Sequence, residues 1–180
     1  MGADLANVSN DELNIPVERG HEYANSGGRH LESVLESFNI TCQDAIVDFG
    51  SGKGGALITF SKFPFSRITG IELSAALVAI AQRNLKGLGA RNIDMIVDDA
   101  VNLTDLEAYN YFYFFNPFPP GVMSKVIKNI AGSVTKKPRK VVIIYFNPEF
   151  HDSIVTDSPF VKVKEFNHHP LGYFIYSNEP

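Results

Sequence analysis

The chain has 180 residues, of which 44% are hydrophobic and 20% charged, and its formal net charge is −4. This length fits one domain with a sizeable core, and the acidic balance disfavours a partner held through many phosphate contacts. The single cysteine, Cys42, excludes an intrachain disulfide and predicts a reducing, cytoplasmic setting. No apolar run approaches the ~20 residues that cross a bilayer, and the polar start lacks the features of a signal peptide, so no membrane association is expected.

Helical and extended patterns alternate along most of the chain. Residues 1–27 are polar and are expected to form an N-terminal arm with little structure of its own, while residues 28–180 are expected to form one domain. The spacing of Leu31, Val34, Leu35 and Phe38 predicts a helix. Five apolar segments then predict buried strands, at 45–47, 67–71, 93–97, 111–115 and 140–146. Further helices are expected to begin near Gly54, Ser74 and Gly121.

The last part of the chain has a different pattern. Residues 160–166 alternate apolar and polar side chains, and residues 173–177 follow a turn-rich link, so the two segments predict a hairpin. Five β-α steps and a hairpin predict an α/β fold with a doubly wound, mainly parallel seven-stranded sheet in three layers and a reversed strand near one edge. Ligands of such sheets bind at the carboxyl ends of the strands, where strand order reverses.

The segment AIVDFGSGKGG, at residues 45–55, places four glycines directly after the first strand. Glycine allows positive φ and the close approach of a ligand to the backbone. The phosphate-binding pattern Gly-x-x-x-x-Gly-Lys-[Ser/Thr] fits poorly, because Val47 stands at the first glycine position and Gly54 at the hydroxyl position. The dinucleotide pattern Gly-x-Gly-x-x-Gly matches literally at Gly50, Gly52 and Gly55. It leaves a dehydrogenase with only a hairpin for its substrate-binding region.

A third pattern accounts for more residues. The segment VDFGSGKG resembles the first motif of class I methyltransferases that use S-adenosylmethionine, with Asp48, Gly50, Gly52 and Gly54 at the motif positions. GIELS at 70–74 resembles the second motif, in which an acidic residue, here Glu72, binds the ribose hydroxyls. A carboxylate only accepts hydrogen bonds and therefore suits two vicinal hydroxyls. The resemblance implies a Rossmann-like fold.

Two later segments continue the resemblance in the same order. VDDA at 97–100 is similar to the segment after the third strand, with Asp98 in place of the family's glycine and Asp99 implied to accept a bond from the adenine amino group. FFNPFPP at 114–120 lies where the family's fourth motif lies. The cofactor-binding residues that the resemblance implies are Asp48, Gly50, Ser51, Gly52, Gly54, Glu72, Leu73, Asp98, Asp99, Ala100 and Asn116.

The fourth motif bears on the acceptor. In methyltransferases acting on amino groups, an Asn-Pro-Pro-aromatic motif accepts hydrogen bonds from the target nitrogen, which implies catalytic roles for Asn116, Pro117 and Phe118. Here Phe118 occupies the second proline position and Pro119 the aromatic one, so the usual stacking residue is displaced. In the resembling family the stretch before the first helix folds over the cofactor and shapes the acceptor pocket, which implies acceptor binding by Tyr23, Asn25 and Ser26 of the arm; a disordered arm is the alternative.

The sequence therefore predicts a class I methyltransferase that uses S-adenosylmethionine and methylates a nitrogen of a protein, such as a lysine amine, or of a small molecule. Nucleic acid ranks lower as a partner, because the net charge is acidic and no added recognition domain is visible. A non-catalytic S-adenosylmethionine-binding subunit or sensor, and an NAD(P)-dependent oxidoreductase, remain as alternatives. The basic residues at 136–140 are interpreted as a solvated loop, or otherwise as a contact for an acidic substrate. The adjacent His168 and His169 are interpreted as structural or solvated, and no metal site is expected.

Overall fold

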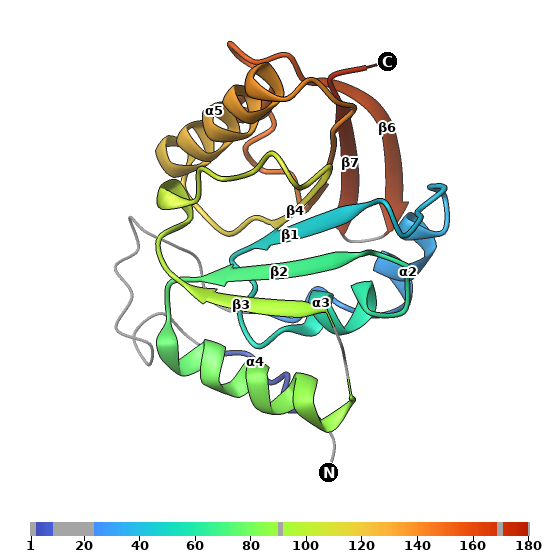
Figure 1. Ribbon diagram of the computed structural model, residues 1–180, viewed down its shortest axis with the longest axis vertical. Helices are drawn as coiled ribbons and strands as arrows, with labels where there is room; N and C mark the ends of the chain where they lie inside the picture. The colour runs from blue at the N-terminus through green and yellow to red at the C-terminus, as the bar shows by residue number, and fades with distance from the viewer. Residues whose placement is uncertain (1–2, 9–23, 90–91, 169–170, 180) are drawn as a thin grey trace.

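The computed structural model describes residues 3–8, 24–89, 92–168 and 171–179 (Figure 1). The strands are β1 (Ala45–Phe49), β2 (Arg67–Glu72), β3 (Ile93–Val97), β4 (Tyr111–Phe115), β5 (Val142–Phe146), β6 (Val161–His168) and β7 (Leu171–Ser177). The helices are α2 (Arg29–Leu35), α3 (Gly55–Phe60), α4 (Ala75–Gly87), the short 3-10 helix η1 (Ala100–Asn102), α5 (Pro120–Lys136) and α6 (Asp152–Val155).

The seven strands form one sheet in the order β3-β2-β1-β4-β5-β7-β6. The pairs within β1 to β5 are parallel, and β7 runs antiparallel to both β5 and β6. Strand order reverses between β1 and β4, so their carboxyl ends flank the crevice in which such folds bind ligands. The predicted Rossmann-like, doubly wound fold, with its mainly parallel seven-stranded sheet and C-terminal hairpin, is confirmed.

Helices cover both faces of the sheet. One core joins α5 and α6 to side chains such as Phe112, Phe114 and Tyr145, and the other joins α2 and α3 to side chains such as Ile46 and Tyr113. In Figure 1, α5 lies above the strands and α4 below them. Full burial of one large apolar side chain contributes about 1.5–3 kcal/mol, so two continuous cores hold the strand ends in fixed positions.

The helical predictions hold with two differences. The Ser74 hydroxyl caps α4 as expected, because its oxygen accepts a bond from the Leu77 N–H at 3.3 Å. Leu88 continues the apolar spacing of Leu77, Ala81 and Leu85, but it is 57% exposed because the helix ends at Gly87. The helix α6 was not predicted, since four residues are too few to show a periodic pattern.

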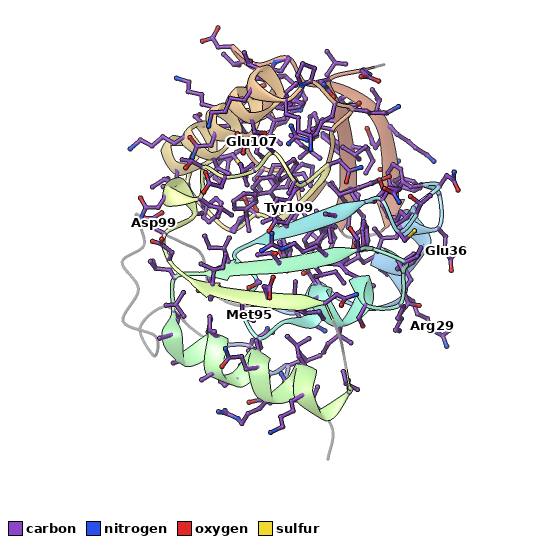
Figure 2. The ribbon with its side chains drawn as sticks, viewed as in Figure 1. Arg29, Glu36, Met95, Asp99, Glu107 and Tyr109 are labelled. Atoms are coloured by element: carbon purple, nitrogen blue, oxygen red, sulfur yellow. The ribbon has the colours of Figure 1, made fainter. Side chains whose placement is uncertain are left out.

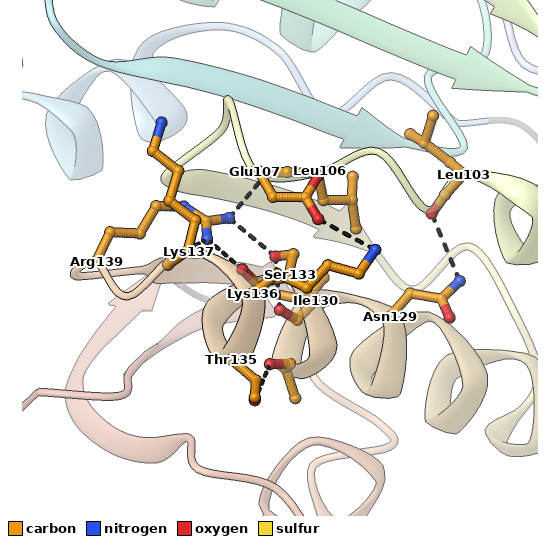
Figure 3. Close-up of polar contacts among 11 residues, drawn as sticks. Leu103, Leu106, Glu107, Asn129, Ile130, Ser133, Thr135, Lys136, Lys137 and Arg139 are labelled. Carbon is orange, nitrogen blue, oxygen red and sulfur yellow. Dashed lines mark hydrogen bonds and ion pairs between the residues drawn. The ribbon is translucent and has the colours of Figure 1, made fainter.

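The basic segment 136–140 is not simply a solvated loop (Figure 3). The Arg139 guanidinium donates to the carbonyls of Leu106, Tyr109, Ser133 and Lys137 at 2.6–3.0 Å and to the Ser133 hydroxyl at 2.9 Å. It therefore ties the last turn of α5 to the segment that leads into β4. A planar fork of five donors is the feature that makes arginine suited to this role.

Candidate functional site

The glycine loop is held against the end of β2. The N–H groups of Gly50 and Ser51 both donate to the Ile71 carbonyl, at 2.9 and 3.1 Å. Gly50, Gly52 and Gly54 have φ values of 79°, 52° and 83°, which side-chain-bearing residues rarely adopt. The glycines are thus required by the backbone path of the loop, as the sequence predicts.

Glu72 connects β2 to this loop. One carboxylate oxygen accepts from the Gly52 N–H at 3.0 Å and the other from the Ser74 N–H at 2.9 Å. Each oxygen keeps a second lone pair for a ligand hydroxyl. Burial raises the pKa of Glu72, and these backbone bonds act in the opposite direction.

Asp48 adds a second buried acid at the end of β1. Its side chain is 3% exposed, and burial first, then the charge of Glu72, raises its pKa well above the usual range. Among the described residues, no cation lowers the pKa of either carboxyl. Two acids beside a glycine loop, to which no described residue supplies a counter-charge, fit a cationic ligand that carries hydroxyl groups, such as S-adenosylmethionine.

The residues after β3 form a tight polar turn. Asp98 accepts from the Asp99 N–H at 2.6 Å and from the Asn102 amide at 2.8 Å. Asp99 caps η1 through a bond from the Val101 N–H at 3.1 Å, and Ala100 is buried. Leu73 is 39% exposed at the end of β2. Asp98 therefore stabilises the turn. Asp99, labelled at the left of the view in Figure 2, and Leu73 lie just after the carboxyl ends of β3 and β2.

The end of β4 lies against the glycine loop. A Cβ on Gly50 would come within 2.6 Å of the Pro117 side chain, so only glycine allows this approach. Asn116 is buried and has a φ of 38°. Phe118 faces inward, with its ring 6.4 Å from that of Phe114 in a T-shaped pair. Asn116 and Pro117 thus border the crevice, whereas Phe118 packs in the core.

Tyr145 of β5 holds Asn116 in place. Its hydroxyl donates to Asn116 Oδ1 at 3.0 Å and accepts a long bond from the Phe150 N–H at 3.4 Å. Burial raises the pKa of Tyr145 to about 12, so the phenol keeps its proton at neutral pH. Sequence reasoning missed this residue, because its position in an apolar strand resembles that of any core tyrosine.

A second hollow lies beside this edge of the sheet. Its volume is about 250 Å³, and its lining residues are Asn25, Ser26, Gly27, Arg29, His30, Phe146 and Tyr173. Asn25 lies directly against Gly55 at the start of α3, and Ser26 lies beside the buried Tyr113 hydroxyl. Asn25 and Ser26, predicted for acceptor binding, are therefore brought to the carboxyl edge of the sheet, while Tyr23 lies outside the described residues. Arg29 is on the opposite side of the view from Asp99 (Figure 2), so this cavity is remote from the adenine side.

Residues 3–8 also contact the glycine loop. Asp4 and Asn84 of α4 exchange two bonds of 2.9 Å, and the Asn84 amide also reaches the Lys53 carbonyl at 3.1 Å. The buried Lys53 ammonium pairs with the Asp4 carboxylate at 2.8 Å, which lowers the pKa of Asp4. This contact could not be predicted from the sequence, in which Lys53 instead resembles the lysine of a phosphate-binding loop.

The fold and the site define a nucleotide-cofactor domain with a paired-acid, glycine-loop crevice. Its sequence matches the family described as "Methyltransferase domain" over residues 46–137, about half of the chain. The chain belongs to this family, as a class I S-adenosylmethionine-dependent methyltransferase domain.

Individual relatives differ in what they methylate. The chain is 34% identical over 77 residues to EEF1A lysine methyltransferase 2 of Danio rerio, an alignment that covers 42% of this chain and 33% of that protein. The chain thus spans about a third of the length of this curated relative. It is 24% identical over 164 residues to a tRNA (guanine-N(7)-)-methyltransferase of Pediococcus pentosaceus, covering 89% of this chain and 68% of that one.

Solved structures agree on the fold. A putative methyltransferase from Escherichia coli superposes with a TM-score of 0.65 at 18% identity, covering 92% of this chain and 91% of that one. An RNA methyltransferase from Salinibacter ruber in complex with S-adenosyl-L-homocysteine superposes with a TM-score of 0.62 at 17% identity, covering 82% and 89%. Within the described part of the chain, every helix is too short or too polar to cross a membrane.

Proposed function

We propose that this chain transfers the methyl group of S-adenosylmethionine to a nitrogen of a protein amine or of a small molecule. The observation that carries the proposal is the close approach of Gly50 and Pro117, which sets the Asn116 end of β4 beside the glycine loop. Cofactor and acceptor residues thereby border one crevice. When bound, the cofactor supplies an activated methyl group on a sulfonium.

The cofactor roles follow from the donors and acceptors on the chain. Glu72 accepts from the ribose hydroxyls, Asp99 and Leu73 contact the adenine, and the loop backbone at 50–54 lies along the remainder. Asp48 contributes negative charge near the cationic end, where low local polarity strengthens the attraction. These roles are supported by the position of each residue at the carboxyl ends of β1, β2 and β3.

Methyl transfer depends on aligning the acceptor nitrogen with the methyl group more than on acid–base catalysis. The amine lone pair forms the N–C bond while the S–C bond breaks and its electron pair returns to sulfur, and the ammonium product then loses a proton to solvent. Asn116 and Pro117 orient the acceptor, which is the contribution that positioning makes. The cavity beside Asn25 and Ser26 is large enough for a side chain or a small amine.

Calorimetric titration with S-adenosylhomocysteine, beside NADH, tests the cofactor half of the proposal. Micromolar binding of S-adenosylhomocysteine, without binding of NADH, is expected. Binding of NADH alone would instead support the interpretation of the glycine loop as a dinucleotide site. Transfer of tritiated methyl to poly-L-lysine, n-butylamine and benzylamine, with bulk tRNA as comparator, tests the acceptor half. Binding without transfer to any of these would favour a cofactor-binding subunit over an enzyme acting on simple amines.

A further inference from the structure

We infer that Asn147, at the end of β5, is a second residue that binds the methyl acceptor, with its side-chain oxygen accepting a hydrogen bond from the acceptor nitrogen. The inference rests on the proposed function, since it concerns the same crevice. It also narrows the substrate class to amines and amides whose nitrogen carries at least one hydrogen.

The first support is a repeat within the chain. Phe115-Asn116-Pro117 ends β4, and the same three residue types, Phe146-Asn147-Pro148, end β5. The two strands are neighbours, with Phe115 paired to Phe146 in the sheet. Their rings stack with centroids 4.6 Å apart. The two asparagines therefore leave adjacent strands side by side at the edge where the cofactor crevice lies.

Both asparagines share an uncommon backbone conformation. Asn116 has a φ of 38° and Asn147 a φ of 51°. Asparagine tolerates this region better than other side-chain-bearing residues, although glycine would adopt it more readily. The chain thus keeps an amide side chain at two positions where the backbone alone favours glycine.

The two amides are held in opposite orientations. Asn147 Nδ2 donates to Glu149 Oε1 at 2.8 Å, and a carboxylate can only accept, so the amide nitrogen must face Glu149. Asn147 Oδ1 is then left to face elsewhere. At Asn116 the amide oxygen instead accepts from the Tyr145 hydroxyl, whose own oxygen accepts from the Phe150 N–H. The amide nitrogen of Asn116 is therefore the group left to bind a ligand. Asn147 offers an acceptor and Asn116 a donor.

This difference bears on the expected role of Asn116. The family resemblance assigns the acceptor nitrogen to the Asn116 oxygen, but Tyr145 already uses one lone pair of that oxygen. Asn147 supplies an oxygen to which no described residue donates. An N–H bonded to this oxygen fixes the direction of the remaining lone pair, as methyl transfer requires.

Asn147 directly follows a residue that lines the cavity beside the N-terminal segment. The preceding residue, Phe146, lines this cavity together with Tyr173. The Asn147 N–H donates to the Gly172 carbonyl at 2.9 Å, which fixes the residue next to Tyr173. An acceptor that enters through the cavity therefore reaches the ends of β4 and β5 together.

The test uses Asn147→Gly, a substitution that removes the amide and keeps the favoured backbone. Tritiated methyl transfer is measured with the amine probes named above, together with calorimetric binding of S-adenosylhomocysteine. We expect kcat/KM to fall about 10-fold or more, mainly through kcat, while cofactor affinity stays within about twofold. Asn92→Gly makes the same change at another positive-φ asparagine, before β3, and should leave both values unchanged. Glu149→Ala, which frees the amide but keeps its oxygen, should give a smaller loss.

Unchanged kcat/KM in Asn147→Gly would overturn the inference, as would a parallel loss of cofactor affinity, which would place Asn147 in the cofactor site. A second measurement needs no turnover. In the wild-type S-adenosylhomocysteine complex, n-butylamine added near pH ~9.5, where part of the amine is neutral, should shift the NMR signals of the Asn147 side-chain amide. No shift, with cofactor binding intact, also overturns it. Failure of the wild type to bind S-adenosylhomocysteine would instead refute the proposed function.

Discussion

Replacing Glu72 by glutamine tests the cofactor site most directly. Both oxygens of the carboxylate accept backbone N–H groups, from Gly52 at 3.0 Å and from Ser74 at 2.9 Å. An amide can serve only one of them through its oxygen and must turn an NH₂ group toward the other. The variant therefore disturbs the loop and removes the charge that would bind the ribose hydroxyls.

The size of the effect follows from the bonds involved. A hydrogen bond to a charged group contributes about 1.5–3 kcal/mol, which corresponds to a loss of about 10- to 150-fold in affinity. Because burial raises the pKa of Glu72, removing the charge also relieves a desolvation cost in the free protein. The free energy of unfolding should consequently change less than the free energy of cofactor binding.

The assay is calorimetric titration of S-adenosylhomocysteine into the wild type, Glu72→Gln and Glu107→Gln. Glu107 pairs with Lys136 away from the crevice and serves as the matched control. Affinity in Glu72→Gln equal to that of the wild type would refute the assignment of Glu72, and an equal loss in Glu107→Gln would point to a general effect of charge.

Three further predictions concern neighbouring residues. Asp48→Asn should raise the melting temperature of the ligand-free protein. The pKa of Asp48 is higher in the folded state than in the unfolded state, so the wild type loses folding stability as the pH rises from ~4 through the folded-state pKa. The gain should be absent near pH ~4 and grow toward pH ~8, by about 2–4 °C for each kcal/mol, while cofactor affinity falls; a melting temperature independent of this change at pH ~8 would contradict the buried charge. Tyr145→Phe should lower kcat without weakening S-adenosylhomocysteine binding, because it releases the Asn116 amide, and a loss of cofactor affinity instead would assign that amide to the cofactor. Arg139→Ala should lower the free energy of unfolding by about 2–4 kcal/mol, Arg139→Lys should recover only part of it, and Lys140→Ala should have no effect; urea denaturation measures all three.

The sheet was predictable because its strands are buried on both faces. Continuous apolar runs such as 142–146 and alternation in 161–166 indicate the central and edge strands by composition alone. The loop glycines were equally predictable, since their positive φ values restrict the residue type. Motif order then fixed the positions of Asp48, Glu72 and Asp99 relative to one another.

Contacts between distant segments could not be read in this way. The Asp4–Lys53 pair joins residues 49 positions apart, and the five bonds of Arg139 reach the last turn of α5 and the segment that leads into β4. Neither has a period or a motif. Phe118 was expected near the acceptor because of its place in the fourth motif, but the core beneath α5 takes its ring. The second Phe-Asn-Pro segment was visible in the sequence, and its meaning became clear only from the pairing of β4 with β5.

The interior position of β7 affects how the protein is made. β5 has both of its sheet neighbours only when residues 171–177 have been synthesised, although the strands of the cofactor crevice, β1, β2 and β4, precede it in the chain. During translation at about 5–20 residues per second, the edge of the apolar strand VIIYF stays open for some seconds after it emerges. An open apolar edge pairs readily with other chains. Slower growth at low temperature or a chaperone that shields β5 should therefore raise the yield of folded protein more than stabilising the cofactor loop would.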